Sequence, residues 1–176
     1  PEHEESGRTW LSKGLLRHAK KIANKNVRML EGLVTEEAPL IGVEPSAILT
    51  FRDEYPDLVD DELLEASKRL SANCLLIDEF IAREISKGNI RSELFTKEAR
   101  SVKLHGHCQQ KSMSSLVAAK KALSLPANFE VQLIPSGCCG MAGSFGYEKE
   151  HYNLSMQIGE LVLFPTVRAQ PAEVEI

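Results

Sequence analysis

Residues 130–140 read Glu-Val-Gln-Leu-Ile-Pro-Ser-Gly-Cys-Cys-Gly, a segment rich in aliphatic residues that leads into two adjacent cysteines flanked by glycines. The aliphatic residues favour a strand, and the proline and glycines after them end it. Glycine is tolerated where the backbone adopts unusual dihedrals or approaches a ligand closely. Thiolates among open backbone amides suit an iron–sulfur cluster or a soft metal. The stretch therefore predicts a strand followed by a thiolate site at Cys138 and Cys139.

Strands and helices alternate on both sides of this stretch. The pattern predicts strands at 102–105, 130–134 and 173–176, with helices at 112–123 and 149–163 between them. Strand–helix–strand units at this spacing imply right-handed crossovers and a parallel sheet. We therefore expect the α/β class: a three-layer open sheet, mainly parallel, with helices on both faces and an N-terminal helical part.

A third cysteine follows the strand at 102–105. Because sites in open parallel sheets form at the carboxyl ends of strands, Cys108 is expected at the same sheet edge as Cys138 and Cys139. Two strands would then deliver three sulfurs to one site. A fourth ligand is expected in the loop after the strand that starts near Ala172, which lies beyond Ile176. The 176 residues alone are therefore expected to hold an empty or partly filled site.

The first half of the chain is mainly helical in pattern. Helical spacing predicts a helix over 8–33, a buried strand at 39–43, a short helix within 46–58, and one long helix or two abutting ones over 60–88. Cys74 falls on the apolar stripe of the last segment and is expected in the core.

Composition narrows the class of protein. The chain has 176 residues, 43% hydrophobic, 26% charged, with a net charge of −4, which is typical of a globular domain and gives no basic stripe for nucleic acid. No apolar run approaches the ~18 residues of a membrane span, so direct membrane insertion is not expected. Four cysteines without a secretory signal favour reduced thiols and a cytoplasmic location, or a peripheral one at a membrane through an electron acceptor. The first and last residues suggest that the natural protein continues on both sides.

The motifs carry a family resemblance. Leu-His-Gly-His-Cys-Gln-Gln-Lys at 104–111 and Ser-Gly-Cys-Cys-Gly-Met-Ala-Gly-Ser-Phe-Gly-Tyr-Glu at 136–148 are supported by Val-Glu-Pro-Ser at 43–46 and Arg-Asp-Glu-Tyr-Pro-Asp at 52–57. This pattern resembles the cysteine-rich CCG domain that occurs in heterodisulfide reductase and in the glycolate oxidase iron–sulfur subunit. It is similar to the C-terminal part of FAD-linked oxidase fusions that resemble D-lactate and D-2-hydroxyglutarate dehydrogenases.

The resemblance implies an organisation and a function. Residues 1–58 would end a preceding cysteine-rich repeat, with its helix, strand and Glu-Pro-Ser motif, and 59–176 would form a truncated second CCG repeat. Cys108, Cys138 and Cys139 would ligate a 4Fe-4S cluster in the intact protein. The cluster would take electrons from FAD in a flavin-binding oxidase domain of the same polypeptide and pass them to an unidentified acceptor. The enzyme would be an oxidoreductase acting on a small 2-hydroxy acid, and this fragment alone would be inactive.

The chain departs from the family pattern at two internal positions. Relatives usually carry cysteine where this chain has Ala47, in the motif that closes the first repeat, and commonly histidine where it has Gln109. The first repeat's site is therefore not expected here.

Other residues near the motifs are candidates for supporting roles. His107 is expected to set proton access, and Lys111 to hold an anionic substrate or lower a thiol pKa, so both are assigned to catalysis. For both His105 and His107, the sequence leaves open whether the imidazole has a functional role or makes a structural hydrogen bond. Contacts to the cofactor are assigned to Gly137, Gly140, Gly143 and Glu44.

Two alternatives to an electron-transfer cluster remain. Zinc could occupy the same thiolates and order the loops of a structural or docking domain. Alternatively, Cys138 and Cys139 could cycle directly as a thiol–disulfide pair.

Overall fold

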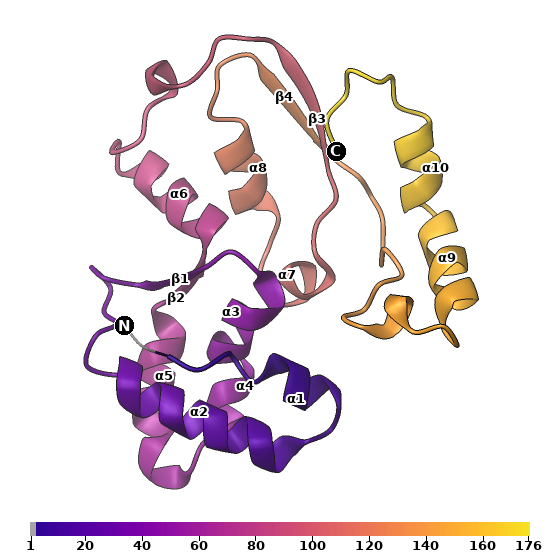
Figure 1. Ribbon diagram of the computed structural model, residues 1–176. Helices are drawn as coiled ribbons and strands as arrows, with labels where there is room; N and C mark the ends of the chain where they lie inside the picture. Colours follow the sequence, from indigo (N-terminus) through magenta and orange to yellow (C-terminus); the bar gives the residue numbers. More distant parts are fainter. Residues whose placement is uncertain (1–2) are drawn as a thin grey trace. The chain divides into compact units, whose positions relative to one another are not determined.

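A computed structural model describes residues 3–176 and divides the chain into two compact units, the first ending at Phe80 and the second starting at Ile81 (Figure 1). Each unit contains helices and a two-stranded parallel sheet. The α/β class and the parallel pairing are thus confirmed. The strands form two separate sheets instead of one open sheet, and the division into repeats at residue 58 stays a prediction.

The first unit begins with two helices where the sequence predicts one. They are α1 (Arg8–Ser12) and α2 (Leu16–Leu30). The break lies at Gly14, whose φ of +74° is left-handed and therefore interrupts helical geometry. The basic side chains of α2 lie at the surface, where Lys20 forms an ion pair with Asp60. The basic residues of α2 therefore form a solvated helix face.

A short strand interrupts the helical run predicted over 60–88. Residues Cys74–Leu76 form β2, which pairs in parallel with β1 (Leu40–Gly42). The guanidinium of Arg52 donates to the Cys74 carbonyl at 2.6 Å, which adds a tertiary contact to the ladder. These contacts override local helix propensity. Helix α3 (Pro45–Arg52) packs against both strands, and the first unit also contains α4 (Glu54–Leu58), the 3₁₀ turn η1 (Asp61–Leu63), α5 (Leu64–Ala72) and the start of α6 (Ile77–Ser86).

The core of the first unit closes around Tyr55. Its ring is fully buried, and its hydroxyl donates to the Ser6 carbonyl at 3.1 Å and accepts from the Asn26 amide at 2.9 Å. These bonds satisfy polar atoms that burial would otherwise leave costly. Cys74 is also fully buried, which confirms its prediction as a core residue. Other members of this core are Ala19, Ala23, Val27, Leu30, Leu49 and Leu70.

Alkaline pH is expected to destabilise the first unit. Burial raises the pKa of the Cys74 thiol to about 12 and also raises the pKa of Tyr55. Both groups therefore hold their protons more tightly in the folded protein, and the stability they contribute is lost as the pH rises above about 9. We expect a loss of about 1.4 kcal/mol per pH unit for each group that ionises only on unfolding. Urea unfolding between pH 8 and 11 measures it, and Cys74→Ala should reduce the slope.

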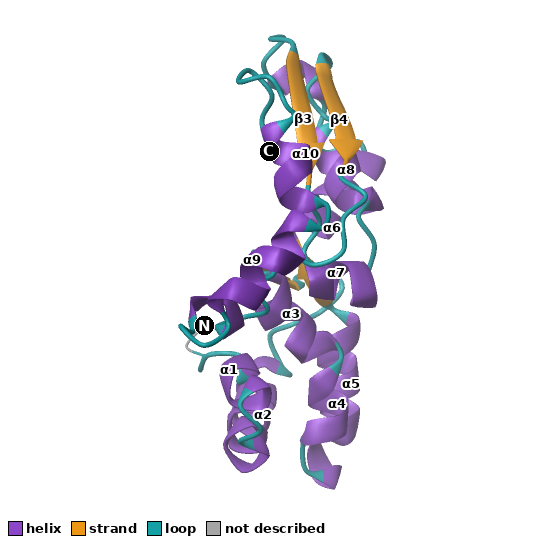
Figure 2. Cartoon of the chain, turned by 90° about the vertical axis from the view of Figure 1, so that its right-hand side faces the viewer, coloured by secondary structure: helices purple, strands orange, loops and turns teal. Residues whose placement is uncertain are grey.

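The second unit is built on β3 (Arg100–Leu104) and β4 (Phe129–Leu133), which lie side by side (Figure 2). They run parallel, with Leu104 opposite Leu133. Helix α8 (Val117–Leu123) packs against β4. The sequence predicts one helix over 112–123, and this boundary is wrong. Helix α7 (Cys108–Met113) precedes α8, and the hydroxyl of Ser115 accepts from the Val117 amide at the break. Serine competes in this way with helical hydrogen bonds.

Short elements complete the second unit. They are the 3₁₀ turns η2 (Ser92–Leu94) and η3 (Phe145–Tyr147) and the helices α9 (Tyr152–Glu160) and α10 (Leu163–Arg168). The helix predicted over 149–163 corresponds to α9, which is shorter at both ends, and α10 begins where the predicted range stops. The strand predicted at 173–176 is reduced to one parallel bridge between Glu175 and Val102. None of the helices within 3–176 is long and apolar enough to span a bilayer.

Candidate cysteine site

The candidate site lies at the carboxyl ends of β3 and β4, within the second unit. Because Leu104 and Leu133 pair at the ends of parallel strands, the loops that follow them leave the same edge of the sheet. Cys108 begins α7 after the first loop, and Cys138 and Cys139 lie in the second. The parallel pairing of β3 with β4 thus agrees with the arrangement that the sequence predicts for these two strands.

Cys138 lies where a thiolate is stabilised. Its sulfur accepts a hydrogen bond from the Gly140 amide at 3.2 Å, and this bond is the main reason that its pKa is lowered. Hydrogen bonds with the Cys108 and Cys139 side chains and the positive charge of Lys111 lower the pKa further. All of these groups favour the ionised sulfur, which is the form that binds metals and attacks electrophiles.

The pKa of Cys108 shifts in the direction opposite to that of Cys138. Loss of solvation is the main cause that raises the pKa of Cys108, and its interaction with Cys138 raises it further. Of these two thiols, Cys138 therefore ionises more readily. All four cysteines are free thiols. Within residues 3–176, no group of three or more His, Cys, Asp or Glu side chains is arranged to hold a single metal ion.

Lys111 reaches from α7 to the loop that contains the adjacent cysteines. Its ammonium donates to the Ser136 carbonyl at 2.8 Å and to the Gly137 carbonyl at 2.6 Å. The two carbonyls belong to the two residues that precede Cys138. Lys111 therefore joins the helix that starts at Cys108 to the cysteine loop, while its catalytic role stays a prediction.

His105 and His107 each make a hydrogen bond within the second unit. The Nδ1 atom of His107 accepts from the Gln109 amide at 3.2 Å and so caps the start of α7. The Nδ1 atom of His105 lies 2.5 Å from the Ser136 hydroxyl, and burial, followed by the charges of Lys111 and His107, lowers the pKa of His105. From the sequence alone, Ser136 is not expected as the hydrogen-bond partner of His105. Its position directly before Gly-Cys-Cys could have indicated that it belongs to the site.

The three glycines assigned to cofactor contacts differ in backbone conformation and in the space around them. Gly140 has a φ of +96°, and a Cβ atom there would lie 2.2 Å from the Ser155 carbonyl oxygen in α9. Gly143 also has a left-handed φ, +68°, but open space around it, whereas Gly137 has open space without a left-handed φ. Gly140 is therefore required by both conformation and packing. Ser155 carries no sequence signal for this contact, because its backbone makes it.

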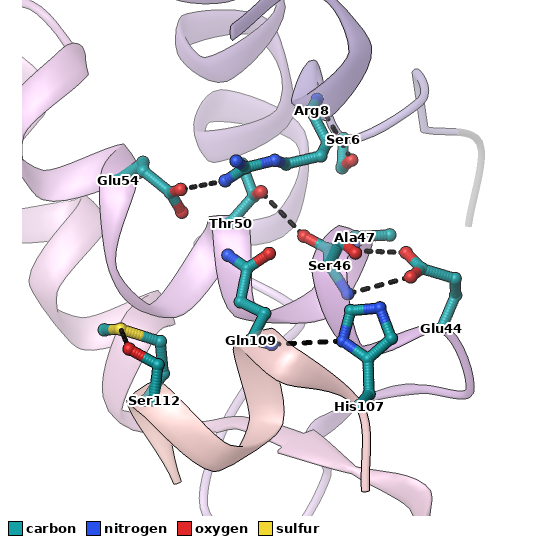
Figure 3. A network of polar contacts seen from close by, with 11 residues as sticks. Ser6, Arg8, Glu44, Ser46, Ala47, Thr50, Glu54, His107, Gln109 and Ser112 are labelled. Atoms are coloured by element: carbon teal, nitrogen blue, oxygen red, sulfur yellow. Dashed lines mark hydrogen bonds and ion pairs between the residues drawn. The ribbon is translucent and has the colours of Figure 1, made fainter. Parts of the chain in front are cut away.

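Glu44 lies in the first unit and caps a helix. Both carboxylate oxygens point at the start of α3, where they accept from the Ser46 amide at 2.9 Å and the Ala47 amide at 2.5 Å (Figure 3). Pro45 occupies the first helical position, where its missing N–H costs nothing. Glu44 thus has a structural function, and its assignment to a cofactor stays a prediction.

Replacing Glu44 by alanine is expected to lower the free energy of unfolding by about 1 kcal/mol, because two amides at the start of α3 lose their acceptor. Urea unfolding followed by circular dichroism measures the change. Glu44→Gln keeps one acceptor oxygen and should lose less. A variant Glu44→Ala with unchanged stability and reduced cofactor content would contradict the capping role.

Comparison with known proteins relates this chain to dehydrogenases. D-2-hydroxyglutarate dehydrogenase of Escherichia coli K12 is 30% identical over 158 residues, which cover 89% of this chain and 14% of that protein. The protein of the same name from Pantoea ananatis is 23% identical over 96% of this chain and 16% of its own length. Anaerobic glycerol-3-phosphate dehydrogenase of Escherichia coli K12 has a subunit that is 25% identical over 85% of this chain and 36% of its own length.

No family model matches the chain, and no solved structure matches it. The chain spans 14–16% of the length of the two D-2-hydroxyglutarate dehydrogenases. Over most of its own length, therefore, this chain is similar to a small part of D-2-hydroxyglutarate dehydrogenases and to about a third of one polypeptide of a glycerol-3-phosphate dehydrogenase.

Proposed function

We propose that the chain is the iron–sulfur electron-transfer module of a flavin-linked oxidoreductase that acts on a small 2-hydroxy acid. The observation that carries the proposal is the placement of Cys108 and of the Cys138–Cys139 pair after two adjacent parallel strands, whose carboxyl ends lie at one edge of the sheet. Similarity to D-2-hydroxyglutarate dehydrogenases supports the substrate class. FAD would lie in a separate domain of the same polypeptide, and the protein would be cytoplasmic or peripheral at a membrane.

The chemistry of the donor set, three cysteine thiols, suits a thiolate-bound cluster, although within residues 3–176 these side chains are not arranged around a single metal ion. Cys138 is stabilised as a thiolate by the Gly140 amide, and N–H bonds to sulfur are one of the means by which proteins tune cluster potentials. Cys108, Cys138 and Cys139 would hold the cluster, which supplies one-electron transfer when bound. In this proposal the chain comprises the end of one cysteine-rich repeat, 1–58, and a second CCG repeat, 59–176.

A thiol–disulfide function is the second candidate. The free state of all four cysteines and the lowered pKa of Cys138 favour it, because a stabilised thiolate is also a nucleophile. In that case Cys138 would react directly, without a metal. The two candidates differ in what the purified protein contains.

Metal and sulfide analysis of the full-length protein, purified without oxygen, tests the proposal. We expect iron and acid-labile sulfide in equal amounts, with visible absorption that bleaches when D-2-hydroxyglutarate is added. Zinc without sulfide would overturn the electron-transfer function and support a structural site. Absence of metal, with a thiol count that changes with redox state, would support the thiol–disulfide function instead.

A further inference from the structure

The helix that begins at Cys108 also carries the cation of the site. Cys108 and Lys111 are three residues apart in α7, so both side chains lie on the same face of the helix. From that face, Lys111 reaches the Ser136 and Gly137 carbonyls, at 2.8 Å and 2.6 Å. One side chain thus connects the segments that contribute Cys108 and Cys138.

These two hydrogen bonds also orient the loop backbone. In a trans peptide the carbonyl and the following N–H point to opposite sides. Because the Ser136 and Gly137 carbonyls face Lys111, the N–H groups of Gly137 and Cys138 point away from its ammonium. Within the described residues, the amides of Gly137, Cys138 and Cys139 form no hydrogen bond. Open N–H groups such as these can donate to an anionic group, including the sulfurs of an iron–sulfur cluster.

We propose that Lys111 is the positioning residue of the cysteine site: it holds the Cys138–Cys139 loop against α7, and its charge sets the reduction potential of the centre that the thiolates bind. The second part rests on the proposed function, whereas the first is a property of the chain without a cofactor. A cation near a redox centre stabilises the reduced, more negative state. The hydrogen bonds that Lys111 donates to two backbone carbonyls fix the position of its ammonium.

The potential of the centre tests the role of the charge. In the full-length protein, Lys111→Met is expected to lower the ratio of reduced to oxidised centre about tenfold at a fixed ambient potential, equivalent to 59 mV for one electron. Lys111→Arg keeps the charge and several donors, so it should stay within about twofold of the original protein. The control is Lys120→Met, an exposed lysine of α8, which should leave the ratio unchanged. A ratio within twofold of the original protein in Lys111→Met would overturn the role of the charge.

A second measurement tests the positioning role without any cluster. In metal-free protein, added glutathione disulfide oxidises Cys108 and Cys138 to a disulfide: the two thiols give up two protons and two electrons, and the oxidant becomes two glutathione thiols. Mass spectrometry follows the rate of this linkage. We expect Lys111→Met to slow it about tenfold, because the loop no longer holds the sulfurs together, and Lys111→Arg to restore it.

The two measurements separate the two proposals. Absence of iron and sulfide with slowed linkage in Lys111→Met would reject the cluster and retain the positioning role. A normal cluster with unchanged potential and unchanged linkage in Lys111→Met would reject the positioning role alone. Circular dichroism confirms that each variant is folded, and Lys111→Gln supplies a neutral polar variant if Lys111→Met fails to fold.

Discussion

Replacing Cys138 by serine is expected to remove the visible absorption of the full-length protein and to reduce its iron and acid-labile sulfide to background. The pKa of Cys138 is lowered, first by the hydrogen bond from the Gly140 amide and further by the two neighbouring thiols and the Lys111 charge, so Cys138 forms a thiolate more readily than an ordinary cysteine. Serine keeps the size of the side chain but stays protonated at neutral pH, so it is a poor ligand for soft metals. This is the largest functional effect that we expect of a single substitution.

Cys74→Ala is the matched control, because it also removes one thiol. Cys74 is fully buried in the first unit, its thiol donates to the Leu70 carbonyl, and its raised pKa keeps it protonated. This variant should therefore retain iron and sulfide. Cys139→Ser should lose the cluster as Cys138→Ser does. Unaltered spectra in either serine variant would remove that cysteine from the proposed ligands.

Substitution of Gly140 by alanine is expected to lower the free energy of unfolding by about 2–4 kcal/mol. The left-handed φ of +96° costs a residue with a side chain about 1–2 kcal/mol. The new Cβ would also lie 2.2 Å from the Ser155 carbonyl oxygen, which is backbone and cannot rotate away. The loop or α9 must then shift, at a cost typical of overpacked sites.

Two further glycines provide graded controls for this prediction. Gly143→Ala has the left-handed φ but no steric conflict and should cost about 1 kcal/mol, whereas Gly137→Ala has neither and should be close to neutral. Urea unfolding of all three variants, followed by circular dichroism, measures the series. Equal losses at Gly140 and Gly143 would show that the contact with Ser155 contributes nothing. Loss of iron in a stable Gly137→Ala would support the assignment of this glycine to the cofactor.

The sheet of the second unit could be predicted because its signals are local. The strands expected at 102–105 and 130–134 correspond to β3 and β4, shifted by one or two residues. In each, aliphatic residues alternate with polar ones and a glycine or proline follows, and the helical residues between the two strands favour parallel pairing. Since parallel strands place their carboxyl ends together, the neighbourhood of Cys108 and Cys138 followed from the pattern.

Features that depend on tertiary contacts could not be predicted. β2 has three residues, Cys74–Leu76, which continue an apolar helical stripe and form a strand only because β1 offers a ladder. The partners of Lys111 are backbone carbonyls, and a carbonyl has no signature in the sequence. For the same reason, the contact between Gly140 and Ser155 is visible only in the fold. Glu44 shows the opposite case, where a helix cap resembles a binding motif because both use a carboxylate before exposed amides.

Because Val102 of β3 forms a bridge with Glu175, this part of the second unit forms only after β4 has been synthesised. β3 pairs with β4 on one side and, through Glu175, with the last residues of the chain on the other. At ribosomal rates of about 5–20 residues per second, Glu175 is synthesised about 2–9 s after Val131 of β4. For those seconds the second edge of β3 has open N–H and C=O groups, the kind of edge at which chains associate wrongly. The ion pair of Arg100 with Glu175 then helps to close that edge.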